Sequence, residues 1–263
     1  MSAQRTLAVH LLPQLFEPAQ VVGGAAVIID ILRASSTITT ALDNGALNVV
    51  PCGSVEDALQ LRAALGADRV LLGGERGGVR IDGFDLGNSP FEYPREIVQG
   101  KVVVFTTTNG TKALLRASQA DEVYIGSFLN LSAVCQRLMV STRPVHLVCA
   151  GTDGQVTGED VLFAGALCDQ LVRESKLSGQ FEFQLTDSAV IARAAWSEAV
   201  VIDESQPVRS GIEQLSWAMS QTHGGRNLRR LGFDWDIAYC SAIDSLSCLA
   251  YRSDAGNGNL VLL

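Results

Sequence analysis

Short apolar runs alternate with segments of helical period along the first two thirds of the chain, and this alternation constrains the fold more than any other feature. Glycines punctuate the joins between the segments. Strands that are buried on both faces read as short, nearly continuous apolar runs. The runs predict strands at residues 7–11, 26–31, 47–51, 69–72, 101–105, 122–125 and 145–149.

The segments between these runs carry apolar residues at helical spacing. They predict helices at residues 36–43, 55–65, 111–117, 132–140 and 159–172. Strands that alternate with helices indicate βαβ units. We therefore predict an α/β fold with three layers, α/β/α, around a largely parallel or mixed central sheet. Right-handed crossovers would bring the loops that follow the strands to one edge of that sheet.

The last third of the chain is less regular. We expect helices at residues 188–199, 212–219 and 227–231, and strands at 236–240 and 260–263. No low-complexity linker or internal repeat separates this part from the rest. We predict a single domain over residues 1–263 whose last third caps or completes the sheet, and the alternative is a C-terminal subdomain from about residue 180.

Charge and composition exclude several classes of function. The net charge of −8 argues against nucleic-acid binding, which needs clustered Lys and Arg. No apolar run reaches the length of a membrane span, and no secretory signal precedes the first strand. The six cysteines form no C-x-x-C pair and read as reduced thiols, so we expect a cytoplasmic protein. The apolar composition is compatible with a homodimer, although it does not establish one.

Four loops that follow predicted strands carry nearly all of the chemically suggestive residues. In the first loop, Asp30 ends a strand and can hold a hard cation such as Mg²⁺, which prefers oxygen ligands. Arg33 offers a planar fork of donors for phosphate or sulfonate. Ser35, Ser36 and Thr37 open the next helix, where they either cap it or cradle phosphate.

The second loop places Glu75 and Arg76 between two glycine pairs, with Gly77 next and Asp85 further along. Long irregular loops inside compact domains are often functional, although a flexible surface loop has the same composition. We expect Glu75 or Asp85 to orient an attacking water or to protonate a leaving alkoxide. Arg76 and Gly77 are candidates for binding the substrate.

The third and fourth loops precede helices. Backbone N–H groups in the third loop are candidates for holding an anion, although a plain turn explains the same residues. In the fourth loop, Glu159 or Asp160 would join Asp30 around Mg²⁺, although the helix dipole alone favours acidic residues there. His223, beside two glycines, is a further candidate for substrate binding. In the third loop the candidates for substrate binding are Thr108, Asn109, Gly110 and Thr111.

The motifs of several well-known phosphatase classes are absent. The only Asp-x-Asp comes late, at Asp234, and lacks the residue that a haloacid-dehalogenase-type phosphatase needs after it. No cysteine begins a Cys-x5-Arg loop, and no Arg-His-Gly occurs. The three histidines are too dispersed for an evident dinuclear metal motif.

The four loops, in this order, resemble the 2-phosphosulfolactate phosphatase family, often called the ComB family. The match runs through residues 27–37, 74–78, 83–90, 106–111, 151–152 and 159–161, and then from 220 to 237. The resemblance implies Mg²⁺-dependent hydrolysis of (2R)-2-phospho-3-sulfolactate to (2R)-3-sulfolactate and phosphate, by a phosphoric monoester hydrolase. It does not assign the catalytic residues, so the roles above come from chemistry. An aspartyl nucleophile, Asp30, is the competing mechanism.

Two alternatives remain open at this point. A phosphatase for another small phosphorylated hydroxy acid would keep the same loops but lack a sulfonate pocket. A non-catalytic protein that binds an anionic metabolite would keep the loops without releasing phosphate.

Overall fold

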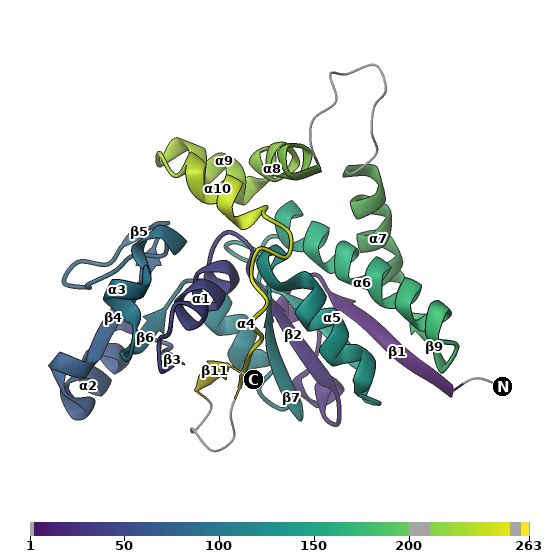
Figure 1. Ribbon diagram of the computed structural model, residues 1–263, viewed down its shortest axis with the longest axis horizontal. Coiled ribbons are helices and arrows are strands. Elements are labelled where there is room, and N and C mark those ends of the chain that lie inside the picture. Colours follow the sequence, from purple (N-terminus) through teal and green to yellow (C-terminus); the bar gives the residue numbers. More distant parts are fainter. Residues whose placement is uncertain (1–2, 200–210, 253–258, 263) are drawn as a thin grey trace.

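The central sheet is mixed and spans the molecule. The computed structural model describes residues 3–199, 211–252 and 259–262. Among these residues the strands form one sheet in the order β5-β4-β6-β3-β11-β10-β7-β2-β8-β1-β9 (Figure 1). The strands are β1 (Ala3–His10), β2 (Ala25–Ile29), β3 (Asn48–Pro51), β4 (Val70–Arg76), β5 (Val79–Arg80), β6 (Val102–Thr106), β7 (Glu122–Gly126), β8 (Val145–Cys149), β9 (Phe181–Leu185), β10 (Ala250–Arg252) and β11 (Leu260–Leu262).

The seven strands predicted in the first two thirds all form, and they fall into two parallel groups. Strands β4, β6 and β3 pair in parallel, and so do β7, β2, β8, β1 and β9. Strands β10 and β11 lie between the groups and pair antiparallel with each other, with β7 and with β3. The prediction of a largely parallel or mixed sheet is confirmed.

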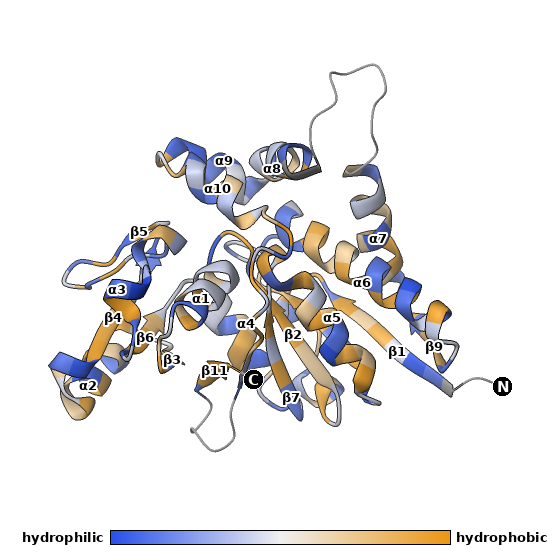
Figure 2. Cartoon of the chain, viewed as in Figure 1, coloured by the Kyte–Doolittle hydropathy of each residue, from blue (hydrophilic) through white to orange (hydrophobic). Residues whose placement is uncertain are grey.

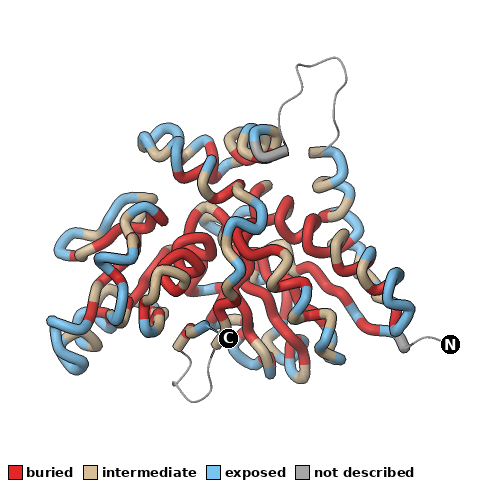
Figure 3. Tube along the Cα trace, in the orientation of Figure 1, coloured by how far each residue is buried: buried red, intermediate tan, exposed pale blue. Residues whose placement is uncertain are grey.

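Helices cover both faces of the sheet, which confirms the three-layer prediction. Val27 and Ile29 of β2 pack in a core with α5, α6 and α7, whereas Ala26 and Ile28 pack in a second core with α1 and α4. This alternation is the period of a strand that is buried on both faces. The apolar strands and their burial are visible in Figures 2 and 3. The helices are α1 (Ala34–Asp43), α2 (Val55–Leu65), α3 (Arg95–Val98), α4 (Gly110–Arg116), α5 (Leu131–Val140), α6 (Gly158–Ser178), α7 (Asp187–Ala199), α8 (Gly211–Ser220), α9 (His223–Arg230) and α10 (Asp234–Cys240).

The last third both extends the sheet and covers one end of it. Strand β9 adds an edge strand beside β1, while α8, α9 and α10 lie together above the sheet (Figure 1). The prediction of a strand at residues 236–240 is wrong, because these residues belong to α10. The buried residues of α10, Asp236, Ile237 and Cys240, share one face of a helix, which packs better here than an extended segment. The predicted strand at 260–263 forms as β11, and Leu263 lies outside the described residues.

Among the described residues, no helix combines the length and apolar character needed to cross a bilayer.

Candidate active site

The four loops singled out from the sequence meet around one cavity of about 100 Å³. The first, third and fourth follow β2, β6 and β8, whereas the second comprises the end of β4, its turn into β5 and the segment after β5. Helix α9 closes the remaining side. The walls of the cavity therefore come from segments that are far apart in the sequence. They are formed by Asp30, Leu32, Arg33, Glu75, Gly77, Gly78, Asn88, Thr108, Asn109, Thr152, Asp153, Gly224, Asn227 and Leu228.

Asp30 is held by a tight turn between β2 and α1. Its backbone N–H donates to the Ser35 hydroxyl at 2.9 Å, and the Ser35 N–H donates back to the Asp30 carbonyl at 2.8 Å. The N–H of Ala34 donates to the carboxylate at 3.3 Å. On the other side the carboxylate meets Gly110, where an added Cβ would lie 2.7 Å from Asp30 Oδ2. Glycine at position 110 thus lets the third loop approach the carboxylate closely.

The charge on Asp30 is disfavoured by its surroundings. Burial raises the pKa of the Asp30 carboxyl from 3.8 to about 7, against the N–H groups of Ala34 and Gly110, which lower it. Glu75 and Glu159 add to the rise because their negative charges lie nearby. A cation in the cavity would relieve this repulsion.

Glu75 ties the second loop to the third. This buried carboxylate accepts the N–H of Thr108 at 2.9 Å and the N–H of Gly78 at 2.8 Å, one on each oxygen. Because both of its oxygens are engaged by backbone donors, Glu75 fixes the relative position of two walls of the cavity. It does so while its own side chain faces the space between them.

Glu159 lies in the first turn of α6 and against the start of α9. Burial raises the pKa of its carboxyl, whereas a hydrogen bond from Thr222, the charge of His223 and the N–H of Gly224 lower it. An added Cβ at Gly224 would meet Glu159 Oε1 at 2.0 Å, so only glycine permits this contact. The other oxygen, Oε2, is buried and has no partner among the described residues.

Asp160, the next residue, is a brace between the first and fourth loops. Its Oδ1 accepts the N–H of Ile31 at 2.9 Å, and its Oδ2 accepts the N–H of Gly151 at 3.0 Å and the Thr157 hydroxyl at 3.3 Å. Burial and the neighbouring Glu159 and Asp30 charges raise the pKa of Asp160 well above its usual value. Because both of its oxygens are engaged and its side chain lies outside the cavity wall, Asp160 holds the first and fourth loops together.

Comparison with known proteins identifies the family of the chain. Residues 10–254 match the family described as 2-phosphosulpholactate phosphatase. The chain belongs to this family. Relatives named probable 2-phosphosulfolactate phosphatase include one from Symbiobacterium thermophilum, 37% identical over 93% of this chain and 96% of its own length. Another, from Thermotoga petrophila, is 42% identical over 83% and 85%. One from Caldanaerobacter subterraneus is 39% identical over 83% of each. Like the family, the chain is a phosphoric monoester hydrolase.

In this member of the 2-phosphosulpholactate phosphatase family, Arg33 places a positively charged side chain in the cavity wall. Its guanidinium donates to Asp236 Oδ2 at 2.7 Å and to the carbonyl of Gly78 at 2.7 Å. It also lies over the ring of Phe233, 4.3 Å from the ring centre. The other predicted arginine, Arg76, donates to the Glu75 carbonyl and to the Thr106 hydroxyl and is not part of the wall.

The three hydroxyls that open α1 turn inward. Ser35 donates to the carbonyl of Ile28, Ser36 to that of Ile31, and Thr37 to that of Asn88. Each of the three residues is buried and lies outside the cavity wall. In this structure they hold the loop that presents Asp30, but they do not cap α1, because its N-cap residue is Arg33 and no side chain caps the helix.

Three further candidates also lie outside the wall. Asp85 accepts hydrogen bonds from Arg62 at 2.9 Å and from the N–H of Leu72 at 2.8 Å. The Thr111 hydroxyl accepts the N–H of Thr107. His223 is exposed at the start of α9, beside Glu159. Of the third-loop candidates, Thr108 and Asn109 line the cavity, as does Gly77 of the second loop.

Several wall residues were not singled out from the sequence as site residues. Asn88 and Asn227 carry amide groups, and Asp153 adds a third acidic side chain to the wall. The Oδ1 atom of Asn88 and the Oγ1 atom of Thr108 are buried without a partner among the described residues. Asn88 and Asp153 could have been found as polar side chains close to the second and fourth loops. Nothing in the sequence pointed to Asn227.

The residues present fit a magnesium ion that is held by two carboxylates and completed by water and substrate oxygens. No group of three His, Cys, Asp or Glu side chains within the described part of the chain is arranged to hold a metal by itself. However, Mg²⁺ usually keeps several waters and uses one or two carboxylates together with substrate phosphate. Asp30, disfavoured as a lone anion, and Glu159, with its unpartnered Oε2, supply such a pair.

Proposed function

We propose that this protein is a Mg²⁺-dependent phosphatase that hydrolyses (2R)-2-phospho-3-sulfolactate to (2R)-3-sulfolactate and phosphate. The observation that carries the proposal is a single cavity in which the Asp30 carboxylate and the Arg33 guanidinium share a wall, in a chain of this family. The names of the relatives support the same substrate.

Arg33 and the third loop would bind the anionic groups of the substrate. A guanidinium presents planar pairs of N–H donors that match phosphate, sulfonate and carboxylate oxygens. Thr108 and Asn109 lie in the same wall, where the chain turns from β6 into α4. Their polar groups would hold oxygens that Arg33 does not reach.

Asp30 and Glu159 would hold Mg²⁺. When bound, the ion supplies positive charge to the phosphoryl oxygens during in-line displacement. Glu75 faces the cavity and Asp85 does not, so Glu75 is the better candidate to orient the attacking water or to protonate the leaving alkoxide. The competing role of Asp30 as nucleophile predicts a phosphorylated peptide containing residue 30 after acid quench of a turnover mixture.

The direct test is phosphate release by the purified protein from (2R)-phosphosulfolactate, with Mg²⁺ and then with EDTA. We expect release that EDTA abolishes and added Mg²⁺ restores. Phospholactate and phosphoglycolate, assayed in parallel, separate this substrate from other phosphorylated hydroxy acids. Equal kcat/KM for all three would overturn the substrate, and binding without release would replace the enzyme by a metabolite-binding protein.

A further inference from the structure

Arg33 is clamped between the second loop and the C-terminal helices. Its side chain is 2% exposed, although the residue forms part of the cavity wall. Gly78 of the β4–β5 turn accepts from one terminal nitrogen, and Asp236 of α10 accepts from the other. Phe233, just before α10, covers the face of the guanidinium. Two of the three contacts therefore come from the last third of the chain.

Asp236 is itself fixed at both oxygens. Its Oδ2 pairs with Arg33 at 2.7 Å, and its Oδ1 accepts the Ser89 hydroxyl at 2.7 Å. The Asp236 side chain is 3% exposed and does not line the cavity. Any effect of Asp236 on a ligand is therefore indirect, and Arg33 is the wall residue that Asp236 contacts directly.

Stability alone does not account for this arrangement. A buried ion pair is seldom worth more to a fold than two well-packed apolar side chains of the same volume. It does fix the plane of the guanidinium, because a carboxylate held at both oxygens leaves its partner little freedom. A guanidinium carries five N–H groups, and Asp236 and Gly78 take one each. The same planar group forms part of the cavity wall.

We propose that Asp236 is a positioning residue, which orients Arg33 for a substrate anion only while α10 is docked on the site. The C-terminal helices are then part of the anion-binding machinery rather than a passive cover. This role rests on the proposed function in one respect, because it requires Arg33 to contact an anionic group in the cavity.

The test compares Asp236→Asn with Asp234→Asn, a matched change at an exposed position of the same helix, whose side chain is 62% exposed. We expect Asp236→Asn to lower kcat/KM for phosphosulfolactate at least tenfold and to weaken the binding of inorganic phosphate, measured by calorimetry. Asp234→Asn should stay within twofold of wild type in both measurements. Ser89→Ala removes the second support of Asp236 and also one half of the capping box that Ser89 forms with Glu92, so its melting temperature is measured alongside, and it should show a smaller loss in the same direction.

A double-mutant cycle with Arg33→Gln separates positioning from a general structural role. If Asp236 acts through Arg33, Asp236→Asn changes kcat/KM less than twofold once Arg33 is replaced, and the single variants divide their losses between KM and kcat in the same proportion. Independent, multiplicative losses would overturn the proposal. Wild-type phosphate binding that depends on Asp236, with no turnover of phosphosulfolactate, would refute the substrate and leave the positioning role standing.

Discussion

At the scale of single residues, the site holds charges that the fold by itself does not favour. Asp30 and Glu159 are both buried acids whose pKa values are raised chiefly by loss of solvent. Such groups are retained where a ligand compensates them, and they tend to cluster in functional sites. The stability of the free protein should therefore improve when the charge is removed, while activity is lost.

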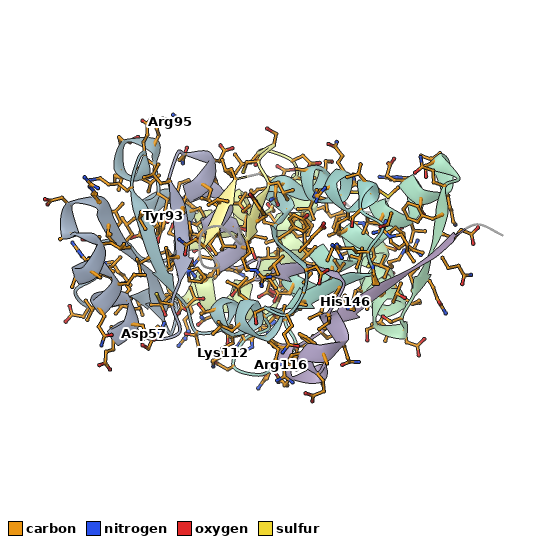
Figure 4. The ribbon with its side chains drawn as sticks, turned by 90° about the horizontal axis from the view of Figure 1, so that it is seen from below. Asp57, Tyr93, Arg95, Lys112, Arg116 and His146 are labelled. Carbon is orange, nitrogen blue, oxygen red and sulfur yellow. The ribbon has the colours of Figure 1, made fainter. Side chains whose placement is uncertain are left out.

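Asp30→Asn tests directly whether stability is gained while activity is lost. We expect kcat to fall by about three orders of magnitude or more, as for removal of a central catalytic group. In EDTA at pH 8 the melting temperature should equal or exceed that of wild type, because the variant no longer buries a disfavoured negative charge. Asp57→Asn, on the exposed surface of α2 (Figure 4), is the control for both measurements. Near-normal turnover by Asp30→Asn would remove Asp30 from the mechanism.

Gly110→Ala probes the fit between the third loop and Asp30. The new Cβ would lie 2.7 Å from Asp30 Oδ2 and 3.0 Å from Ala34 Cβ, so the carboxylate must shift. We expect kcat/KM to fall by about tenfold to a hundredfold, since small displacements of reacting groups cost this much. Stability should change little, because alanine favours the helix. Gly53→Ala, where an added Cβ meets nothing within 4 Å, should keep full activity. Equal activities of the two variants would contradict this account.

At the scale of elements, the sequence is most informative where burial is complete. The seven strands of the first two thirds are apolar runs, and all of them form. Strand β9 was missed because it lies at the sheet edge, where its buried and exposed residues alternate over only five positions. The error at α10 has a related cause. Its Trp, Ile and Tyr alternate with other residues like those of a strand, and seven residues are too few to reveal the helical period.

Local sequence patterns also decide which parts of the site could be predicted. Asp30, Arg33, Glu75 and Glu159 sit in local patterns, at strand ends and helix starts. The structure places the first three in the cavity wall and packs Glu159 against Gly224 of that wall. The inward turn of the Ser35, Ser36 and Thr37 hydroxyls depends on backbone carbonyls that the local pattern does not specify. Asp236 is more remote still, since it reaches Arg33 across 203 positions of sequence.

The contact between β1 and β8 gives a prediction for pH. His10 Nε2 and His146 Nδ1 lie 3.1 Å apart on these adjacent strands, and Figure 4 labels His146. Burial, and then His146, lowers the pKa of His10 from 6.5 to about 4, and burial lowers the pKa of His146. Below pH 6.5 the unfolded chain thus binds more protons than the folded one. This contribution to stability is complete above pH 6.5 and is lost as the pH falls towards 4.

His10→Gln measures the size of this effect. Between pH 7 and pH 5, wild type should lose on the order of 1 kcal/mol relative to the variant, which is about half of what the full pKa shift would give, because solvent screens a partly exposed ring. Urea unfolding at several pH values gives the difference between the two curves. The difference matters because the raised pKa values of Asp30 and Asp160 act in the opposite direction in both proteins. Parallel curves from pH 8 to pH 5 would show that the protonation of His10 is not linked to folding.

At the scale of the whole molecule, the cavity joins parts of the chain that fold as different layers. Strand ends from both parallel groups supply the loops, and α9 and α10 close them through Gly224 and Asp236. A ligand that bridges these parts binds the folded state alone, so it should stabilise the entire molecule. Anion binding and metal binding should both be visible in unfolding experiments without any turnover.

Magnesium binding can be tested in this way through Glu159. We expect Mg²⁺ at about a hundredfold excess over its Kd to stabilise wild type by about 2.7 kcal/mol, seen as a rise in melting temperature. Glu159→Gln should lose most of this rise, because it removes one of the two carboxylates proposed to hold the ion, while its stability in EDTA should not fall. Asp57→Asn should keep the full rise, since its side chain lies on α2, outside the cavity. An equal rise in melting temperature in wild type and Glu159→Gln would place the ion elsewhere. The buried carboxylates of Asp30 and Glu159 would then need another explanation.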